Sequence, residues 1–197
     1  MRRFLIPASV LALALATPAL ASEPVTKAQV LDAIRTFDAN ASGGVADATP
    51  AKDANDAVAR ASNTILRFSL ESDDVVVDLG ADSVPWCDVK KGVGDLSNSG
   101  ARGLLLAAYL SGCVKAQLDA GKQNPNPYAG WVAMLRIYHA SKIREGVTIP
   151  EIDALMARQA DGTLEAYAAE AVQRSTQNLR KAYGTPARQV ETASAQP

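Results

Sequence analysis

The chain is poor in the side chains that most often carry catalysis or bind metals. It has a single histidine, His139, and two cysteines, Cys87 and Cys113. A zinc site usually takes three or four ligands from histidine, cysteine and acidic residues. Neither a C-x-x-C pair nor the G-x-S-x-G turn of many serine hydrolases occurs in the sequence. We therefore predict no metal site, no bound cofactor and no redox pair, and we interpret His139 as a partly buried helical residue.

Aromatic residues are scarce, and neither sign of charge is in large excess. Aromatics make up 5% of the chain, whereas alanine is abundant. Strands favour aromatic and β-branched residues, so this composition favours helices over a sheet sandwich. The 20 basic residues nearly balance the 21 acidic ones, and no basic stripe occurs. The sequence thus gives no reason to expect a nucleic-acid partner.

No run of the sequence reaches the roughly 20 apolar residues that span a membrane. The apolar run from Phe4 to Leu15 is shorter, follows two arginines and precedes a small-residue A-x-A end. This is the pattern of a secretory signal peptide over residues 1–21, with cleavage after Ala21. The general export route fits better than the twin-arginine route, because the polar context of the latter is missing. We expect a periplasmic or secreted protein with no membrane segment after cleavage.

The expected mature chain suits a single domain. Without the first 21 of 197 residues, 176 remain, which is enough for one hydrophobic core. Two arginines leave with the signal segment, so 18 basic residues face 21 acidic ones and the net charge changes from −1 to −3. We expect a helical domain over residues 22–184. Residues 185–197 are polar and lack periodicity, and we expect them to be disordered.

Apolar residues recur at three- and four-residue spacing between glycine and proline breaks, which predicts helices. Thr26 and Gln29 form a capping-box pattern at the first start. Asn126 is placed to cap a later helix, and Gly121 and Gly146 are placed to end helices. The sequence therefore predicts a single all-α domain of five to six helices. They span about 27–39, 51–71, 101–120, 128–144, 150 to the stop at Gly162, and 163–183.

One long segment, residues 72–100, lacks helical spacing. Val75 to Val77 is β-branched and suggests a short strand, although no partner strand is evident. A loop of this length is usually functional or contains an undetected element. Its acidic residues do not follow EF-hand spacing, and its glycines follow two lysines instead of preceding one. We therefore interpret it as neither a cation site nor a phosphate loop.

The two cysteines bracket the end of this loop and the helix that follows. In an oxidising compartment an even number of cysteines usually pairs. We predict a disulfide between Cys87 and Cys113 that tethers the loop to the helix. It would close a loop of about 26 residues and contribute about 3 kcal/mol. Reduced thiols are the alternative.

Three aromatic side chains are the candidate binding residues: Trp86, Tyr128 and Trp131. Clustered at an exposed groove they would anchor a partner, but we favour the interpretation that they belong to the core. Because catalytic motifs are missing, we expect a non-catalytic binding or interaction protein of the bacterial cell envelope, of the adaptor, inhibitor or immunity type. Its partner would be another envelope or secreted protein. A small hydrolase acting on envelope polymers is the alternative, and it would need two acids across a cleft or a base such as His139.

Overall fold

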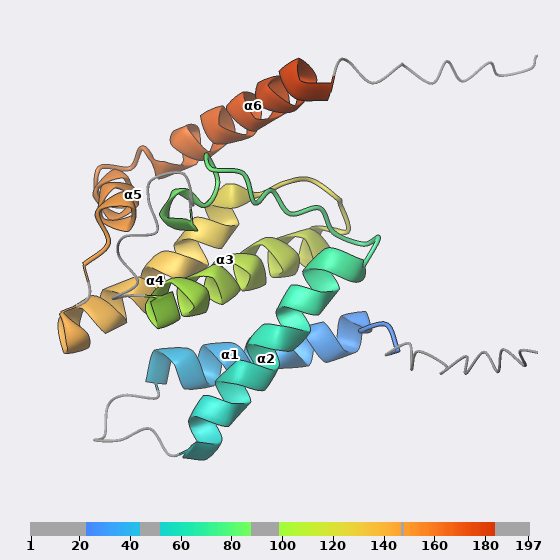
Figure 1. Ribbon diagram of the computed structural model, residues 1–197, viewed down its shortest axis with the longest axis vertical. Helices are drawn as coiled ribbons and strands as arrows, with labels where there is room; N and C mark the ends of the chain where they lie inside the picture. The colour runs from blue at the N-terminus through green and yellow to red at the C-terminus, as the bar shows by residue number, and fades with distance from the viewer. Residues whose placement is uncertain (1–22, 44–51, 88–98, 147, 184–197) are drawn as a thin grey trace, which may run out of the picture.

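The protein is all-α, with six α-helices and one 3-10 helix over the part of the chain described (Figure 1). A computed structural model describes residues 23–43, 52–87, 99–146 and 148–183. The elements are α1 (Lys27–Gly43), α2 (Lys52–Glu71), η1 (Pro85–Cys87), α3 (Ser99–Ala120), α4 (Pro127–Glu145), α5 (Pro150–Ala160) and α6 (Leu164–Tyr183). The predicted helical class is confirmed. The expected signal peptide and C-terminal tail lie outside these residues.

Local capping explains where several helices start and stop. The amide of Gln29 donates to Thr26 Oγ1 at 3.2 Å, and the amide of Thr26 donates to Gln29 Oε1 at 2.8 Å, so the capping box is formed. Asn126 Oδ1 accepts from the amide of Ala129 at 3.0 Å at the start of α4. Gly146 has a φ of 64° just after α4, a left-handed conformation that glycine adopts without strain.

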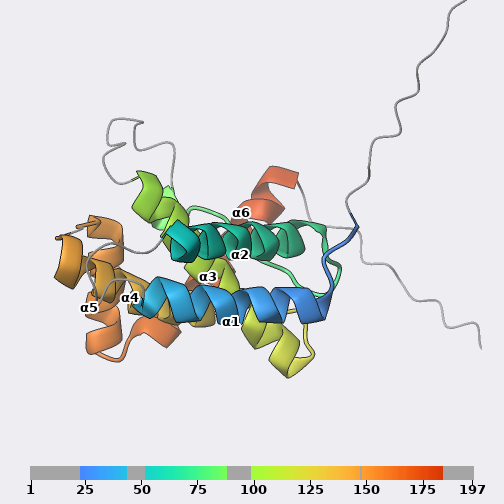
Figure 2. The same cartoon turned by 90° about the horizontal axis from the view of Figure 1, so that it is seen from below.

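The helices pack as three successive pairs. The α1–α2 hairpin lies against the central α3–α4 pair, and α5 and α6 cover the opposite side (Figure 1). The view from below shows α1 and α2 side by side in front of α3 (Figure 2). The core between the layers contains large side chains from each, among them Phe37, Phe68, Tyr109, Trp131 and Tyr138. None of the described helices is both long enough and apolar enough to cross a bilayer.

Two glycines let α3 and α4 approach closely. A Cβ atom on Gly112 of α3 would lie 2.4 Å from the carbonyl oxygen of Ala129 in α4. A Cβ atom on Gly130 of α4 would lie 2.5 Å from the ring of Tyr109 and 2.7 Å from the sulfur of Cys113. Any larger residue at either position would force the helices apart.

The segment between α2 and η1 is held by side chains of the helices and not by a second strand. Val75 to Val77 lies in no strand, so the suggested strand is not formed. Instead, the amide of Val76 donates to Gln117 Oε1 at 2.9 Å, and its carbonyl accepts from Gln117 Nε2 at 3.0 Å. The buried Gln117 of α3 thus replaces the missing partner strand. The suspected hidden elements are η1 and the first turn of α3, while residues 88–98 lie outside the described chain.

The structure does not support the predicted disulfide, because both cysteines are free thiols in it. Arg102 donates to the carbonyl of Trp86, which places Cys87 beside the first turns of α3. Cys113 lies 11 residues further along α3, about 16 Å at the helical rise per residue. A disulfide requires Cα atoms about 4.4–6.8 Å apart. The thiol of Cys113 instead donates to the carbonyl of Asn126 at 3.3 Å.

Candidate binding groove

The described part of the protein contains an open groove of about 890 Å³. Helices α1, α3, α4 and α5 line it, together with the turn before α4. Its apolar lining includes Ile34, Ala116, Tyr128, Ala129, Val132, Ala133 and Met156, and its polar lining includes Asp38, Lys115, Asp119, Arg136 and His139. Ligand sites typically enclose about 300–1,000 Å³ and are mainly apolar with a few polar groups. The groove has this character, and we take it as the candidate functional site.

The register of α4 produces one wall of the groove. Tyr128, Val132 and Arg136 are spaced by four residues and therefore lie on one helix face. Ala129 and Ala133 lie beside this row and also line the groove, on the side of α4 that packs closely on Gly112 of α3. The hollow thus follows from a row of large residues next to a row of small ones.

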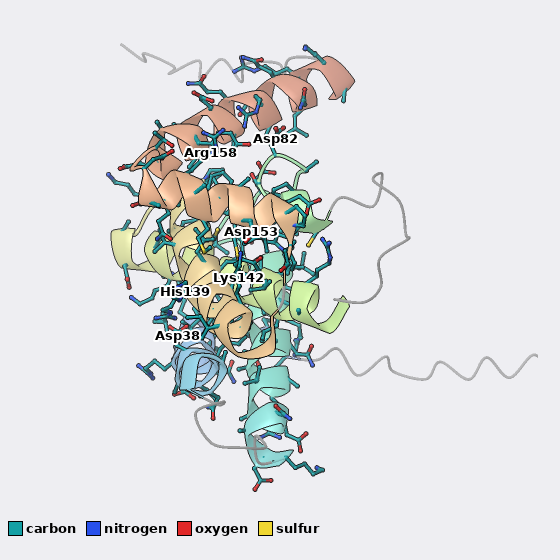
Figure 3. All side chains as sticks on the ribbon, turned by 90° about the vertical axis from the view of Figure 1, so that its left-hand side faces the viewer. Asp38, Asp82, His139, Lys142, Asp153 and Arg158 are labelled. Carbon is teal, nitrogen blue, oxygen red and sulfur yellow. The ribbon has the colours of Figure 1, made fainter. Side chains whose placement is uncertain are left out.

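The charged groups around the groove pair with one another. Lys115 Nζ lies 2.5 Å from Asp119 Oδ2 on α3, and Arg136 of α4 lies 2.6 Å from Asp38 of α1. Asp38 and His139 lie on the same side of the molecule, on neighbouring helices (Figure 3). His139 is exposed, which corrects the expectation of partial burial. Each of these two ion pairs is neutral overall, so together they add no net charge to the rim. A neutral, apolar ligand would therefore not have to displace a buried charge.

The structure does not bring the three predicted binding aromatics together at the surface. Trp131 is 0% exposed, and its Nε1 donates to the carbonyl of Ser83 at 2.7 Å. Trp86 is 2% exposed and meets Tyr109 edge to face, with ring centroids 5.8 Å apart. Both tryptophans therefore belong to the core, which is the interpretation that the sequence favoured. Tyr128 is 38% exposed and lines the groove.

Most groove residues were missed by the sequence reasoning. A signal existed on α4, where the exposed Val132 follows Tyr128 by one turn. No comparable signal marked Ile34 and Asp38 of α1, because their place in the groove depends on how α1 crosses α3 and α4. Aromatic content was the wrong guide, because here the indoles fill the core.

A second polar cluster joins α4 to α5 beside the groove (Figure 3). Asp153 Oδ1 accepts from Tyr138 Oη at 2.8 Å and lies 2.5 Å from Lys142 Nζ. Burial opposes ionisation of Asp153, but the hydrogen bonds from Lys142 and Tyr138 outweigh it, so the pKa of Asp153 falls below its usual value. The hydrogen bond to Asp153 raises the pKa of Lys142. Each group stabilises the charged form of the other, so this cluster acts as a clamp between helices.

The acidic residues of the 72–87 segment are likewise used in structural contacts. Asp74 pairs with Lys27 at 2.9 Å, and Asp82 pairs with Arg174 at 2.9 Å. Asp78 accepts from Ser83 Oγ at 2.8 Å. Among the residues with described positions, no three histidine, cysteine or acidic side chains converge to hold a metal ion.

The chain matches no protein-family model, no curated protein and no solved structure.

Proposed function

We propose that this chain is an exported, non-catalytic binding protein of the bacterial cell envelope and that the groove between α1, α3, α4 and α5 receives its partner. One observation carries the proposal: an apolar groove of about 890 Å³ whose charged rim is internally paired. The signal-peptide pattern of residues 1–21 supports export. An envelope adaptor, inhibitor or immunity protein would use such a surface to bind another envelope or secreted protein.

The chemistry of the groove favours a neutral, apolar part of the partner. Val132 and Tyr128 are exposed large side chains on one face of α4, and the small Ala129 and Ala133 lie between α4 and α3. Burial of apolar surface would supply the binding free energy, at about 25 cal/mol per Å² before the costs of association. An apolar side of a partner helix, seated along the row of small residues, fits this shape.

The hydrolase alternative rests on His139, which is exposed at the same groove. A base needs a second group that it can activate or that can activate it. The acids nearest to this role, Asp38 and Asp119, are each held in an ion pair with a neighbouring cation. We therefore place the hydrolase second, and His139→Ala separates the two proposals: it would abolish hydrolysis but leave the binding of an apolar partner nearly unchanged.

The test compares two exposed β-branched residues of α4. Val132→Glu places a charge in the groove, whereas the matched control Ile143→Glu places one on a part of α4 that does not line it. The chain from Ser22 onward, in wild-type and both variant forms, is used as bait in envelope extract of its own host. We expect one stoichiometric partner that binds the wild type and Ile143→Glu but not Val132→Glu. A partner that Val132→Glu retains would refute the groove.

A further inference from the structure

The segment between α2 and η1 leaves part of its backbone without hydrogen bonds. Val76 is fully paired, because Gln117 bonds both its amide and its carbonyl. In contrast, the amides and carbonyls of Val75, Val77 and Leu79 bond to no other residue whose position is described. Backbone amides and carbonyls require a partner, so water, a part of this chain outside the described residues or another chain must serve these three residues.

The paired and unpaired residues alternate as they do along a strand. In an extended chain the N–H and C=O groups of one residue point to one side, and those of the next residue point to the opposite side. Both groups of Val76 point to α3, and so does the carbonyl of Asp78, which accepts from Tyr109 Oη at 3.0 Å. The backbone groups of the odd-numbered residues therefore point away from α3.

The side chains of Val75, Val76 and Val77 alternate in exposure, and Leu79 departs from this alternation. Val75 is buried and Val77 packs against the core, whereas Val76 is 46% exposed and Leu79 is 41% exposed. The segment thus has properties of a short edge strand. Gln117 and Tyr109 occupy one edge, the other edge is unpaired among the described residues, and exposed apolar side chains lie beside it. Such an edge is a template on which another strand can form.

Charge distinguishes between the possible occupants of this edge. Four acidic residues bracket the valines: Asp73, Asp74, Asp78 and Asp82. Cations of the chain itself neutralise Asp74 and Asp82, whereas Asp73 and Asp78 form no ion pair within the described residues. Two copies of this chain paired edge to edge would bring these acids together and repel. A segment with basic residues at its ends would complement them.

We propose that residues 75–79 are a docking edge for an extended segment of another protein that carries alternating apolar residues between basic flanks. The segment adds as a strand beside Val75, Val77 and Leu79 and supplies their missing hydrogen bonds. This site is independent of the groove, because it lies on the far side of α3 from Lys115 and Asp119. It gives the protein a second interaction surface with a different recognition chemistry.

The test measures amide hydrogen exchange by NMR on the chain from Ser22 onward, alone and with synthetic peptides. The probe is the blocked peptide KTVTVTK. In the free protein we expect the amide of Val76 to exchange slowly and that of Val77 to exchange fast. At a peptide concentration about nine times its Kd, exchange at Val77 should slow about tenfold while Val76 changes little.

Two control peptides separate the sources of binding. ETVTVTE keeps the strand and reverses the flanking charge, and KTVPVTK keeps the charge and removes a central amide. Both should bind more weakly than KTVTVTK. Equal binding of KTVPVTK would show that charge alone attracts the peptide and would overturn the proposal.

A pair of protein variants tests the same edge from the other side. Leu79→Pro removes an outward-pointing amide, whereas Leu79→Ala removes only the exposed side chain. We expect Leu79→Pro to lose protection by the peptide and Leu79→Ala to retain it. An amide of Val77 that is already slow in the free protein would overturn the proposal. So would peptide-induced shifts at Val132 instead of Val77, and that outcome would favour the groove.

Discussion

Substitution of Gly112 by alanine tests the central packing directly, because the added methyl group has no space. The new Cβ atom would lie 2.4 Å from the carbonyl oxygen of Ala129 and 2.8 Å from the Cβ atom of Ala133. Both atoms belong to α4 or its short side chains, so no flexible group can move aside. Overpacking of this kind costs about 1–3 kcal/mol. Alanine regains up to about 1 kcal/mol of helix propensity, so we expect a net loss of about 1–2 kcal/mol.

The matched control is Gly103→Ala, on the same helix. No atom lies within 4 Å of a Cβ atom built at Gly103, so only the gain in helix propensity remains. We expect this variant to be more stable by about 0.5–1 kcal/mol.

Urea and thermal unfolding of the chain from Ser22 onward measure both variants. A domain of this size changes its Tm by about 2–4 °C per kcal/mol, so Gly112→Ala should melt about 2–8 °C lower than the wild type. Gly103→Ala should melt about 1–4 °C higher. If Gly112→Ala is as stable as Gly103→Ala, then Gly112 is not required for the close packing of α3 on α4. That result would refute the prediction.

Three further outcomes follow from the buried polar contacts. Gln117→Leu leaves both backbone groups of Val76 unpaired and should cost about 1–3 kcal/mol, seen in urea unfolding and in faster exchange of the Val76 amide. The pKa of Asp153 is lower in the folded protein than in the unfolded chain. The stability that ionised Asp153 contributes is therefore present above its unfolded pKa and is lost as the pH falls through its folded pKa. Asp153→Asn removes this contribution, so the urea midpoint of that variant should decline less steeply below pH about 4. Burial raises the pKa of Cys113 to about 12 and also raises that of Cys87, so thiol labelling should find Cys113 inert in the native protein. Two free thiols should appear after unreduced denaturation, and no free thiol would restore the predicted disulfide.

The helices were predictable from the sequence because their signals are local. The spacing of apolar residues and the capping patterns at Thr26, Gln29 and Asn126 act within one or two turns of a helix. The predicted starts and ends of the six helices accordingly lie within a few residues of those observed. The end of α1 was the least accurate: it was expected near Ala39 and lies at Gly43.

The sequence predicted a disulfide and suggested a short strand, and the structure contains neither in the described residues. Whether such a feature forms depends on a partner that is distant in the sequence. An even number of cysteines says nothing about how far Cys87 of η1 lies from Cys113 of α3. The segment around Val76 has the composition of a strand but forms none, and the backbone of Val76 bonds instead to the side chain of Gln117, 41 residues later. No local sequence pattern shows that a glutamine side chain will supply the hydrogen bonds that a neighbouring strand would otherwise make. The lining of the groove was mostly not predicted for the same reason, because it depends on contacts between helices that are distant in the sequence. Only Tyr128 of the lining was among the predicted site residues.

Helix α3 positions both proposed surfaces, and this makes them separable by mutation. Gln117 lies two turns after Tyr109 and holds the 75–79 edge, whereas Lys115 lies on the opposite side of the helix and faces the groove. A change confined to one surface, Val132→Glu for the groove or Leu79→Pro for the edge, should leave binding at the other surface intact. A change that moves the whole helix should affect both surfaces. Gly112→Ala is such a change. If this variant folds but loses binding both at the groove and at the 75–79 edge, the close contact of α3 with α4 sets the geometry of both surfaces.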